Sequence, residues 1–374
     1  MRILTIASGG YSSNGALLAS IASAAGLAHR GHDVTMLTPE GGYVDRHINR
    51  DVVPVIHSSL SRWPLSELRR IRDWIVDHEI DVIHTHSSRA SAFGAILRRV
   101  YRVPTVATAH AMKIQLHWCC NDHVIAVSDA TRRFHICRNL VAPWKITTAL
   151  NTVDTNRFQP ISSTHRDAIR ASLGLDPQSP VLGIVGNIIP RKGHCDAVMA
   201  IAKIRYQFPG AVLVIVGQGT DAEIDRVRRI AVAAGVDDAV IWTGYRDDVA
   251  VLLGAFDLLV SPSLNEPFGL IAPESLACEV PVIATRTGGF LTTVQDGQTG
   301  FLISKRSPEQ IAVAAIQLLR NPSLRRSFGI QGRQWVMEHL SVDQHFKTVE
   351  TILSNVARRH VRRTEATTPV RQSA

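Results

Sequence analysis

The sequence predicts an α/β protein made of two doubly wound domains, each built on a parallel sheet. Residues 2–7 (RILTIA) are nearly all apolar, as expected of a strand that is buried on both faces of such a sheet. A turn rich in glycine and serine follows, then a helical apolar pattern that ends at Gly31, and then a second strand over 32–38. A second sheet begins at 181–185, and 374 residues with 45% hydrophobic content are enough for two cores.

The overall composition indicates a cytoplasmic protein. No run approaches the length of about 18 uncharged apolar residues that spans a bilayer. The N-terminus, MRILTIASGG, has the pattern of a first strand rather than that of a signal peptide. The five cysteines are odd in number and lack Cys-x-x-Cys spacing, so we expect reduced thiols instead of a zinc site or a disulfide framework.

Positive charge is concentrated in the first part of the chain. The net charge is +9, and residues 1–160 hold 18 Lys and Arg against 12 Asp and Glu. Such a surface attracts phosphates, membranes or nucleic acid, or is simply solvated. Arg62-Trp63 and the stretch 69–74 (RRIRDW) suit an anionic lipid surface, and equally a half-buried helix. Few aromatic residues and no docking motif disfavour nucleic acid.

The loop after the first strand does not have the pattern of a dinucleotide site. Its glycines do not form Gly-x-Gly-x-x-Gly, and no acidic residue ends the second strand. Both absences disfavour a dehydrogenase. The loop still lies where ligands bind, at the carboxyl end of a parallel strand, and a plain tight turn is the alternative interpretation.

Three histidines lie at the ends of later strands in the first domain. His84 and His86 alternate along one strand and therefore point to the same side. Metal binding would need a third ligand, which the sequence does not offer. His110 ends the apolar strand 104–110, so we expect it over the ligand-binding edge; a lone histidine in the core is the alternative.

The second sheet opens with a loop that predicts a pyrophosphate site. The stretch 186–193 (GNIIPRKG) combines glycines with Arg191 and Lys192 just before a helix. Cations and the free amides of a helix N-terminus together bind phosphate. An exposed basic turn is the alternative interpretation.

Residues 261–289 (SPSLNEPFGLIAPESLACEVPVIATRTGG) organise the second domain. Proline and glycine rule out one long helix, so Glu266 is placed in a loop and Pro273 at the first helical position. Glu274 then lies in the first turn, where the helix dipole is expected to keep it ionised. An ionised carboxylate beside free amides at 268–270 suits a ligand with hydroxyls and phosphates, and does not suit a glycosidase acid.

The segment Glu266-Pro-Phe-Gly-Leu-x3-Glu274 resembles the Glu-x7-Glu motif of the retaining GT-B glycosyltransferases of family four (glycosyl transferases group 1). The resemblance covers roughly residues 2–350. The stretch 151–158 (NTVDTNRF) is similar to a turn of that family, with Thr152 at a usual glycine. The family implies two Rossmann-like domains that face an interdomain cleft, with a C-terminal helix that crosses back.

The resemblance also implies roles for individual residues. In the diphosphate loop Lys192 and Gly193 match, whereas Asn187 stands at the usual arginine, which leaves Arg191 as the second cation. His110 would orient the sugar, Glu266 its hydroxyls and Glu274 the ribose. The remaining donor-binding candidates are Gly15 of Asn14-Gly15-Ala16, Tyr245, Arg246, Phe268, Gly269 and Leu270.

The resemblance predicts an acceptor domain over residues 1–165, a nucleotide-sugar domain over 166–341 and a crossing helix over 342–357. Residues 358–374 are polar, basic and without periodicity, so we expect a disordered tail there. The expected reaction transfers a hexose from a nucleoside diphosphate to an acceptor hydroxyl with retention of configuration, without a divalent metal or other cofactor. A cell-envelope glycan or lipid-linked acceptor would place the enzyme on the inner face of the membrane. A nucleotide-sugar epimerase or a non-catalytic nucleotide-sugar binder remains the alternative.

Overall fold

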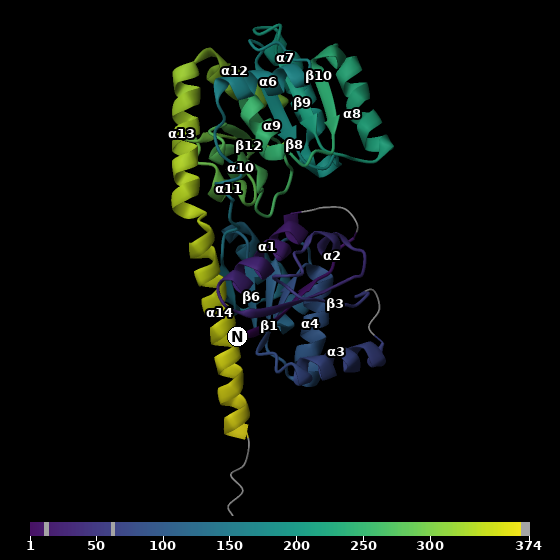
Figure 1. Ribbon diagram of the computed structural model, residues 1–374. Coiled ribbons are helices and arrows are strands. Elements are labelled where there is room, and N and C mark those ends of the chain that lie inside the picture. Colours follow the sequence, from purple (N-terminus) through teal and green to yellow (C-terminus); the bar gives the residue numbers. More distant parts are fainter. Residues whose placement is uncertain (11–14, 61–63, 368–374) are drawn as a thin grey trace, which may run out of the picture. The chain divides into compact units, whose positions relative to one another are not determined.

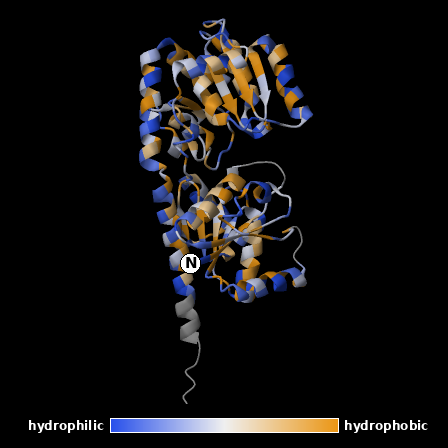
Figure 2. Cartoon of the chain, in the orientation of Figure 1, coloured by the Kyte–Doolittle hydropathy of each residue, from blue (hydrophilic) through white to orange (hydrophobic). Residues whose placement is uncertain are grey.

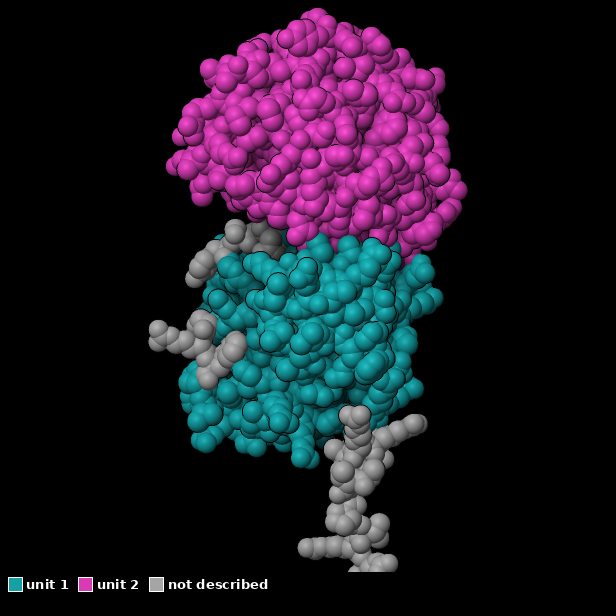
Figure 3. Space-filling view, turned by 180° about the vertical axis from the view of Figure 1, so that it is seen from behind, with its two compact units in different colours: residues 1–151, 343–374 teal, residues 152–342 magenta. Residues whose placement is uncertain are grey.

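The structure is a computed structural model that describes residues 1–10, 15–60 and 64–367. The chain forms two compact units (Figures 1 and 3): unit 1 comprises residues 1–151 and 343–374, and unit 2 comprises residues 152–342. The division falls at Asn151, ahead of the boundary at residue 165 that the sequence suggested. Within the described residues, no helix has both the length and the apolar composition needed to cross a bilayer.

Unit 1 contains a parallel sheet in the order β3-β2-β1-β4-β5-β6-β7. Its strands are β1 (Arg2–Ala7), β2 (Asp33–Thr38), β3 (Val55–His57), β4 (Val82–His86), β5 (Thr105–Ala109), β6 (His123–Ala126) and β7 (Ile146–Thr148). Its helices are α1 (Gly15–His29), α2 (Tyr43–His47), α3 (Leu65–Asp77), α4 (Ser88–Tyr101), α5 (Asp129–Asn139) and α14 (Val342–Thr367), with the short turns η1 (Leu116–Cys120) and η2 (Pro143–Lys145).

The first strand is buried on both faces, as its composition predicts. Ile3 and Ala7 pack in one cluster with α1 and α14, whereas Leu4 and Ile6 pack in another with α3 and α4. Since side chains alternate along a strand, the two clusters are the two faces of the sheet. Helices on both faces make unit 1 doubly wound.

Unit 2 contains a second parallel sheet in the order β10-β9-β8-β11-β12-β13. Its strands are β8 (Val181–Val185), β9 (Val212–Val216), β10 (Val240–Gly244), β11 (Leu258–Ser261), β12 (Val282–Thr285) and β13 (Gly300–Ile303). Its helices are α6 (Ser163–Ser172), α7 (His194–Arg205), α8 (Asp221–Ala233), α9 (Val249–Ala255), α10 (Ile271–Ala277), α11 (Phe290–Thr293), α12 (Pro308–Arg320) and α13 (Pro322–His339), with turns η3 (Pro190–Lys192) and η4 (Asp237–Ala239). Figure 2 shows hydrophobic strands in this sheet beside helices of mixed hydropathy.

The strand order explains where each unit can hold a ligand. In unit 2 the chain winds outward from β8 to β10 and then restarts at β11 on the other side of β8. In unit 1 the same reversal separates β1 from β4. At such a switch point the loops that leave the two adjacent strands diverge and open a crevice at their carboxyl ends.

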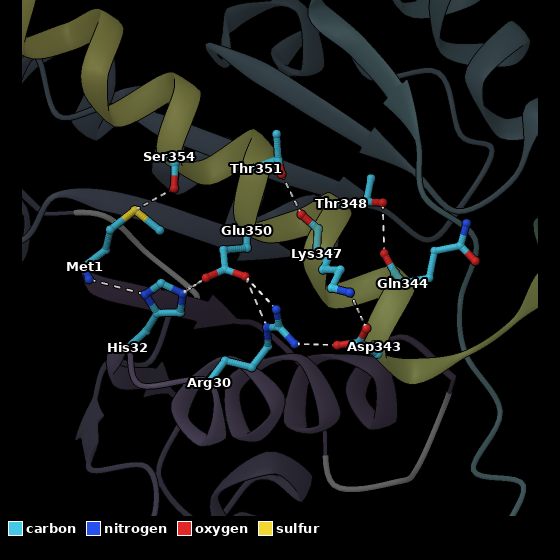
Figure 4. A network of polar contacts seen from close by, with 10 residues as sticks. All are labelled: Met1, Arg30, His32, Asp343, Gln344, Lys347, Thr348, Glu350, Thr351 and Ser354. Carbon is cyan, nitrogen blue, oxygen red and sulfur yellow. Dashed lines mark hydrogen bonds and ion pairs between the residues drawn. The ribbon is translucent and has the colours of Figure 1, made fainter.

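The C-terminal helix belongs to unit 1. Phe346, Val349 and Leu353 on α14 are buried in the cluster that contains α1. Polar contacts also hold α14 against the segment between α1 and β2 (Figure 4). Glu350 on α14 accepts from Arg30 at 3.1 Å and lies 2.9 Å from His32. The chain thus leaves unit 2 after α13 and returns to the first unit, as the resemblance implied.

The expected disordered tail over 358–374 was wrong for its first ten residues. The helix α14 continues through Thr367, and residues 368–374 lie outside the described part of the chain. The physical reason is helix propensity. No glycine or proline occurs between Val342 and Pro369, and the arginines, glutamate and alanine of residues 358–367 are good helix formers.

Candidate functional site

The loops that follow β8 and β11 meet at the switch point of unit 2. These strands are hydrogen-bonded neighbours in the sheet. Beyond them, the amide of Leu264 donates to the carbonyl of Arg191 at 2.8 Å. The loop with the predicted cations and the loop with the predicted carboxylate are therefore one structure.

Both predicted cations converge on Glu266. The Nζ of Lys192 lies 2.7 Å from Oε2 of Glu266, and Nη1 of Arg191 lies 3.4 Å from the same oxygen. The Lys192 side chain is 17% exposed and that of Glu266 is 10% exposed, so the pair is largely withdrawn from water. Arg191 also donates to the carbonyl of Asn265, in the same loop. The side chains of the adjacent residues Arg191 and Lys192 therefore reach the same carboxylate oxygen, and the role of Arg191 as the second phosphate-binding cation stays a prediction.

A tight turn leads from these cations into a helix. Pro190–Lys192 form the 3-10 turn η3, and Gly193 adopts a left-handed conformation (φ 74°) before α7 begins at His194. A Cβ at Gly193 would lie 2.3 Å from the carbonyl oxygen of Pro262, so only glycine fits there. The first amides of α7 thus lie next to Lys192, which is the arrangement that binds phosphate. Asn187 is exposed in the same loop.

The Gly288-Gly289 pair holds the Glu266 loop in place. The carbonyl of Glu266 accepts from the amide of Gly289 at 2.8 Å. Gly288 has φ 55°, and a Cβ there would lie 1.8 Å from the carbonyl oxygen of Glu266. Phe268 is buried against Gly289, and Gly269 (φ 82°) follows with Leu270 at the start of α10.

Glu274 differs from its prediction in two respects. Helix α10 begins at Ile271, so Pro273 is the third helical residue rather than the first. Burial raises the pKa of Glu274 to about 7, although the positive charges of Arg157 and Lys192 act in the opposite direction. The expectation of a carboxylate that is fully ionised near neutral pH was wrong, because the sequence shows the helix dipole and does not show the desolvation.

Tyr245 and Arg246 lie at the carboxyl end of β10, which is two strands from β8. Gly244 ends that strand with φ 70°. Arg246 pairs with Asp248, with Nε 2.7 Å from Oδ1, and Tyr245 is half exposed. Their position on the same edge of the sheet agrees with the prediction, and their role stays a prediction.

In unit 1 the three predicted histidines form one cluster. The rings of His84 and His86 lie 4.3 Å apart, and His86 Nδ1 lies 3.0 Å from His110 Nε2. Burial lowers the pKa of His84 to about 3 and that of His110 to about 4, so both are neutral at pH 7. No group of three or more potential ligands suited to a metal occurs among the described residues.

Gly15 is the first residue of α1, and Asn14 lies outside the described residues. The loop that carries Gly15 leaves β1 at the switch point of unit 1. Ser8 at its start lies 2.6 Å from Ser87, hydroxyl to hydroxyl, and Ser87 follows β4. The two loops at this switch point therefore also touch.

Two residues near the site were not singled out from the sequence. Arg157 lies close enough to Glu274 to lower its pKa, and it donates to the carbonyl of Asp247 at 3.1 Å. His194 is buried at the start of α7, where burial and the charge of Lys192 lower its pKa to about 4. The turn 151–158 contains Arg157 and was the available signal, whereas His194 had none.

Two family models match the chain: Glycosyl transferases group 1 over residues 165–335 and Glycosyltransferase Family 4 over residues 21–157. The first covers the loops after β8 and β11. The chain belongs to the GT-B glycosyltransferases of family four. The GT-B fold also agrees with solved structures. The Anabaena protein Alr3699/HepE in complex with UDP-glucose has a TM-score of 0.86 and 22% identity, over 95% of this chain and 100% of that one.

Curated relatives include several glycosyltransferases. The N-acetyl-alpha-D-glucosaminyl L-malate synthase of Bacillus anthracis is 28% identical over 89% of this chain and 91% of that enzyme. The D-inositol 3-phosphate glycosyltransferase of Acidothermus cellulolyticus is 32% identical over 66% of this chain and 60% of that enzyme. This GT-B protein therefore spans less than two thirds of the second relative.

Proposed function

We propose that the protein is a retaining glycosyltransferase that moves a sugar from a nucleoside diphosphate to an acceptor hydroxyl. The observation that carries the proposal is the convergence of Lys192 and Arg191 on one oxygen of Glu266, directly before the start of α7, at the switch point of unit 2. Two cations and helix amides match the charge and the hydrogen-bonding needs of a diphosphate. Structural neighbours hold UDP and UDP-glucose, which favours a UDP-sugar as the donor.

In this mechanism the bond between the anomeric carbon and the diphosphate oxygen breaks while the acceptor oxygen bonds to the same face of that carbon. The acceptor's proton passes to the departing diphosphate. Lys192, Arg191 and the amides of α7 stabilise the negative charge that builds on the leaving group. In this proposal these groups balance the negative charge of the leaving diphosphate, and the reaction needs no divalent metal.

The two glutamates are proposed to bind the donor's hydroxyls. Glu266 lies beside the cations and would accept from the sugar, while Glu274 would accept from the ribose. In the unliganded protein Glu266 is paired with Lys192, so a diphosphate must share or displace that contact. His110 is proposed to orient the sugar, with its ring held by His86.

The acceptor is proposed to be a cell-envelope glycan or a lipid-linked sugar. The names of two relatives favour a second class, because L-malate and inositol 3-phosphate are small anionic molecules with hydroxyls. An acceptor panel should therefore contain both classes. An epimerase or a non-catalytic binder would bind the donor and transfer nothing.

The test is an incubation of the protein with UDP-, GDP- and ADP-sugars and the acceptor panel, followed by measurement of the released diphosphate and of the product's anomeric configuration by NMR. We expect acceptor-dependent release with one donor, and an anomeric configuration equal to that of the donor. Lys192→Ala should lower turnover by roughly 100-fold or more, as loss of a charge-stabilising donor does elsewhere. Lys203→Ala, which removes an exposed ion pair with Glu309, should not. Inversion, or binding without any transfer, would overturn the proposal.

A further inference from the structure

One edge of unit 1 combines exposed apolar side chains with positive charge. It lies at the amino ends of β6 and β7 and is formed by η1, the end of α5 and η2. The Nζ of Lys145 in η2 donates to the carbonyl of Asn121, directly after η1, at 3.4 Å. These short elements therefore lie next to one another, in the segments that lead into the amino ends of β6 and β7.

Four large apolar side chains project from this surface, which we call the amino-edge face. The exposed fractions are 66% for Ile114, 58% for Leu116, 69% for Leu140 and 78% for Trp144. Single exposed apolar residues are ordinary, whereas four within two short segments form a patch. Their neighbours Trp118 and Val141 are buried in the core, so the exposure is selective.

The exposed side chains are held by ordered backbone. Asn139, which is fully buried at the end of α5, accepts from the amide of Gln115 at 2.6 Å and donates to the carbonyl of Lys113 at 2.9 Å. These two bonds fix the loop with Ile114 and Leu116 beside Leu140. Leu140 itself caps α5 in a left-handed conformation, with its amide bonded to His135. The patch is thus built into the fold.

The charge on this face has one sign. The segments 110–121 and 130–148 contain no Asp or Glu. They contain five cations, namely Lys113, Arg132, Arg133, Arg138 and Lys145. Arg138 and Lys145 belong to the end of α5 and to η2, and Arg132 reaches η2 by donating to the carbonyls of Ile146 and Pro143. Of the two flanking acids, Asp122 pairs with Arg98 at 2.7 Å, and Asp129 lies at the start of α5, beyond the carboxyl end of β6, where it accepts from Thr148 at 2.6 Å. Arg359 on α14 adds a further positive charge near these segments, since its charge lowers the pKa of His123 at the start of β6.

We propose that the amino-edge face docks on an anionic lipid bilayer, with Trp144, Leu140, Leu116 and Ile114 entering the headgroup region. Apolar tips surrounded by lysine and arginine are what an interfacial membrane contact requires. A second copy of the same face would bring like charges together, so this surface does not favour a symmetric dimer. Docking concerns unit 1 alone and does not depend on the transfer reaction in which unit 2 binds the donor.

The predicted lipid-binding helix α3 is less suited to this role. Its cation Arg70 bonds Glu67 at 2.8 Å, and Arg72 bonds Asp73 at 2.6 Å, so neighbouring acids neutralise both. Its exposed residues Leu65 and Val76 serve as a matched control, because they are as exposed as the apolar tips of the amino-edge face. Arg62 and Trp63 lie outside the described residues.

The test is sedimentation of the full chain with vesicles of phosphatidylcholine alone and with one quarter phosphatidylglycerol. We expect binding only to the anionic vesicles and its loss in 0.5 M salt, because surface charges are then screened. The double variant Leu140→Ser/Trp144→Ser should lose most of the binding, and Lys113→Glu/Arg138→Glu should weaken it by about fivefold or more for each cation replaced. The control Leu65→Ser/Val76→Ser should bind as the unaltered protein does.

Each other outcome has a defined meaning. Circular dichroism and the melting temperature of every variant show whether it is folded, so loss of binding with an unchanged melting temperature supports the proposal. Equal binding to both kinds of vesicle, equal loss in the α3 control, or unchanged binding in the charge variant would overturn it. A concentration-dependent dimer that the Trp144 variant abolishes would replace the membrane with a second copy and also overturn it. A failed transfer assay would leave the vesicle result unaffected.

Discussion

The Nζ of Lys192 lies 2.7 Å from Oε2 of Glu266, although the two residues are 74 positions apart in the chain. Each sits in the loop that leaves one of two adjacent strands, β8 and β11. The contact therefore exists because the sheet reverses its order between those strands. It places a cation that can bind phosphate next to a carboxylate that can bind hydroxyls, within one unit of the protein.

The close packing of Gly288 predicts a severe effect of one methyl group. Gly288→Ala would place Cβ 1.8 Å from the carbonyl of Glu266 and so displace the Glu266 loop. We expect a loss of several kcal/mol in the free energy of unfolding, since backbone must move, and a loss of donor binding. Gly297→Ala is the control: its φ is also positive (76°), but its Cβ meets open space, so it should cost only about 1 kcal/mol. Urea unfolding of both variants checks this, and equal losses would contradict it.

The raised pKa of Glu274 predicts pH-dependent donor binding. The ionised carboxylate is the better acceptor for ribose hydroxyls, so affinity should rise with pH through a midpoint near 7. The stability effect has the opposite sign. Between the unfolded pKa near 4.5 and about 7 the folded state binds more protons, so the free energy of unfolding falls as pH rises over this range. Glu274→Gln should remove both dependences. Titration calorimetry at pH 6, 7 and 8 tests the first, and a midpoint that persists in Glu274→Gln would refute the assignment.

The buried histidines predict acid sensitivity of unit 1. Burial lowers the pKa of His84 to about 3 and that of His110 to about 4, so the unfolded chain binds more protons below pH 6.5. Stability contributed in this way is present above pH 6.5 and is lost as the pH falls toward 4. The slope is about 1.4 kcal/mol per pH unit for each histidine. Chemical unfolding at pH 5 to 6.5 should show a smaller slope in His84→Gln, with the exposed His339→Gln as control. Identical slopes in all three proteins would argue against the cluster.

Asp257 predicts a stability effect that is separate from the donor site. It is buried at the start of β11 and lies 2.7 Å from Arg166, 2.9 Å from Arg170 and 3.5 Å from Arg325. Asp257→Ala would leave the buried Arg170 without its carboxylate, and we expect a loss of about 3–5 kcal/mol. Asp238→Ala breaks an exposed pair with Arg205 and should cost less than about 1 kcal/mol. Thermal unfolding of the two variants checks this prediction. Similar melting temperatures would show that the contacts of Asp257 with the three arginines do not stabilise the protein.

The sequence predicted the parts of the site that depend on strand ends. Lys192, Gly193 and Glu266 follow apolar strands and carry turn residues, so their place at the carboxyl edge follows from the order of elements. The same argument predicted that His110 lies at the carboxyl end of its strand. The alternation of His84 and His86 correctly predicted that their side chains lie on the same side of the sheet.

What the sequence did not reveal depends on three-dimensional burial. The pKa of Glu274 follows from how deeply α10 is packed, which no local pattern records. The contact of His86 with His110 joins two strands and needs the register of the sheet. The length of α14 was missed for a different reason, because a basic composition was taken as disorder although its residues favour helix.

The most direct test of the account is the affinity of Lys192→Ala for a nucleoside diphosphate and for the matching nucleoside. Titration calorimetry with UDP and uridine on the unaltered protein, Lys192→Ala and Lys203→Ala separates the phosphate contact from the base contact. We expect Lys192→Ala to weaken UDP binding by about 10- to 100-fold, which corresponds to the loss of one hydrogen bond between charged groups. The affinity for uridine should not change. Lys203→Ala should bind both as the unaltered protein does. If UDP, GDP and ADP all bind Lys192→Ala as tightly as they bind the unaltered protein, or if none of them binds the unaltered protein, then the Lys192–Glu266 pair is not a diphosphate site.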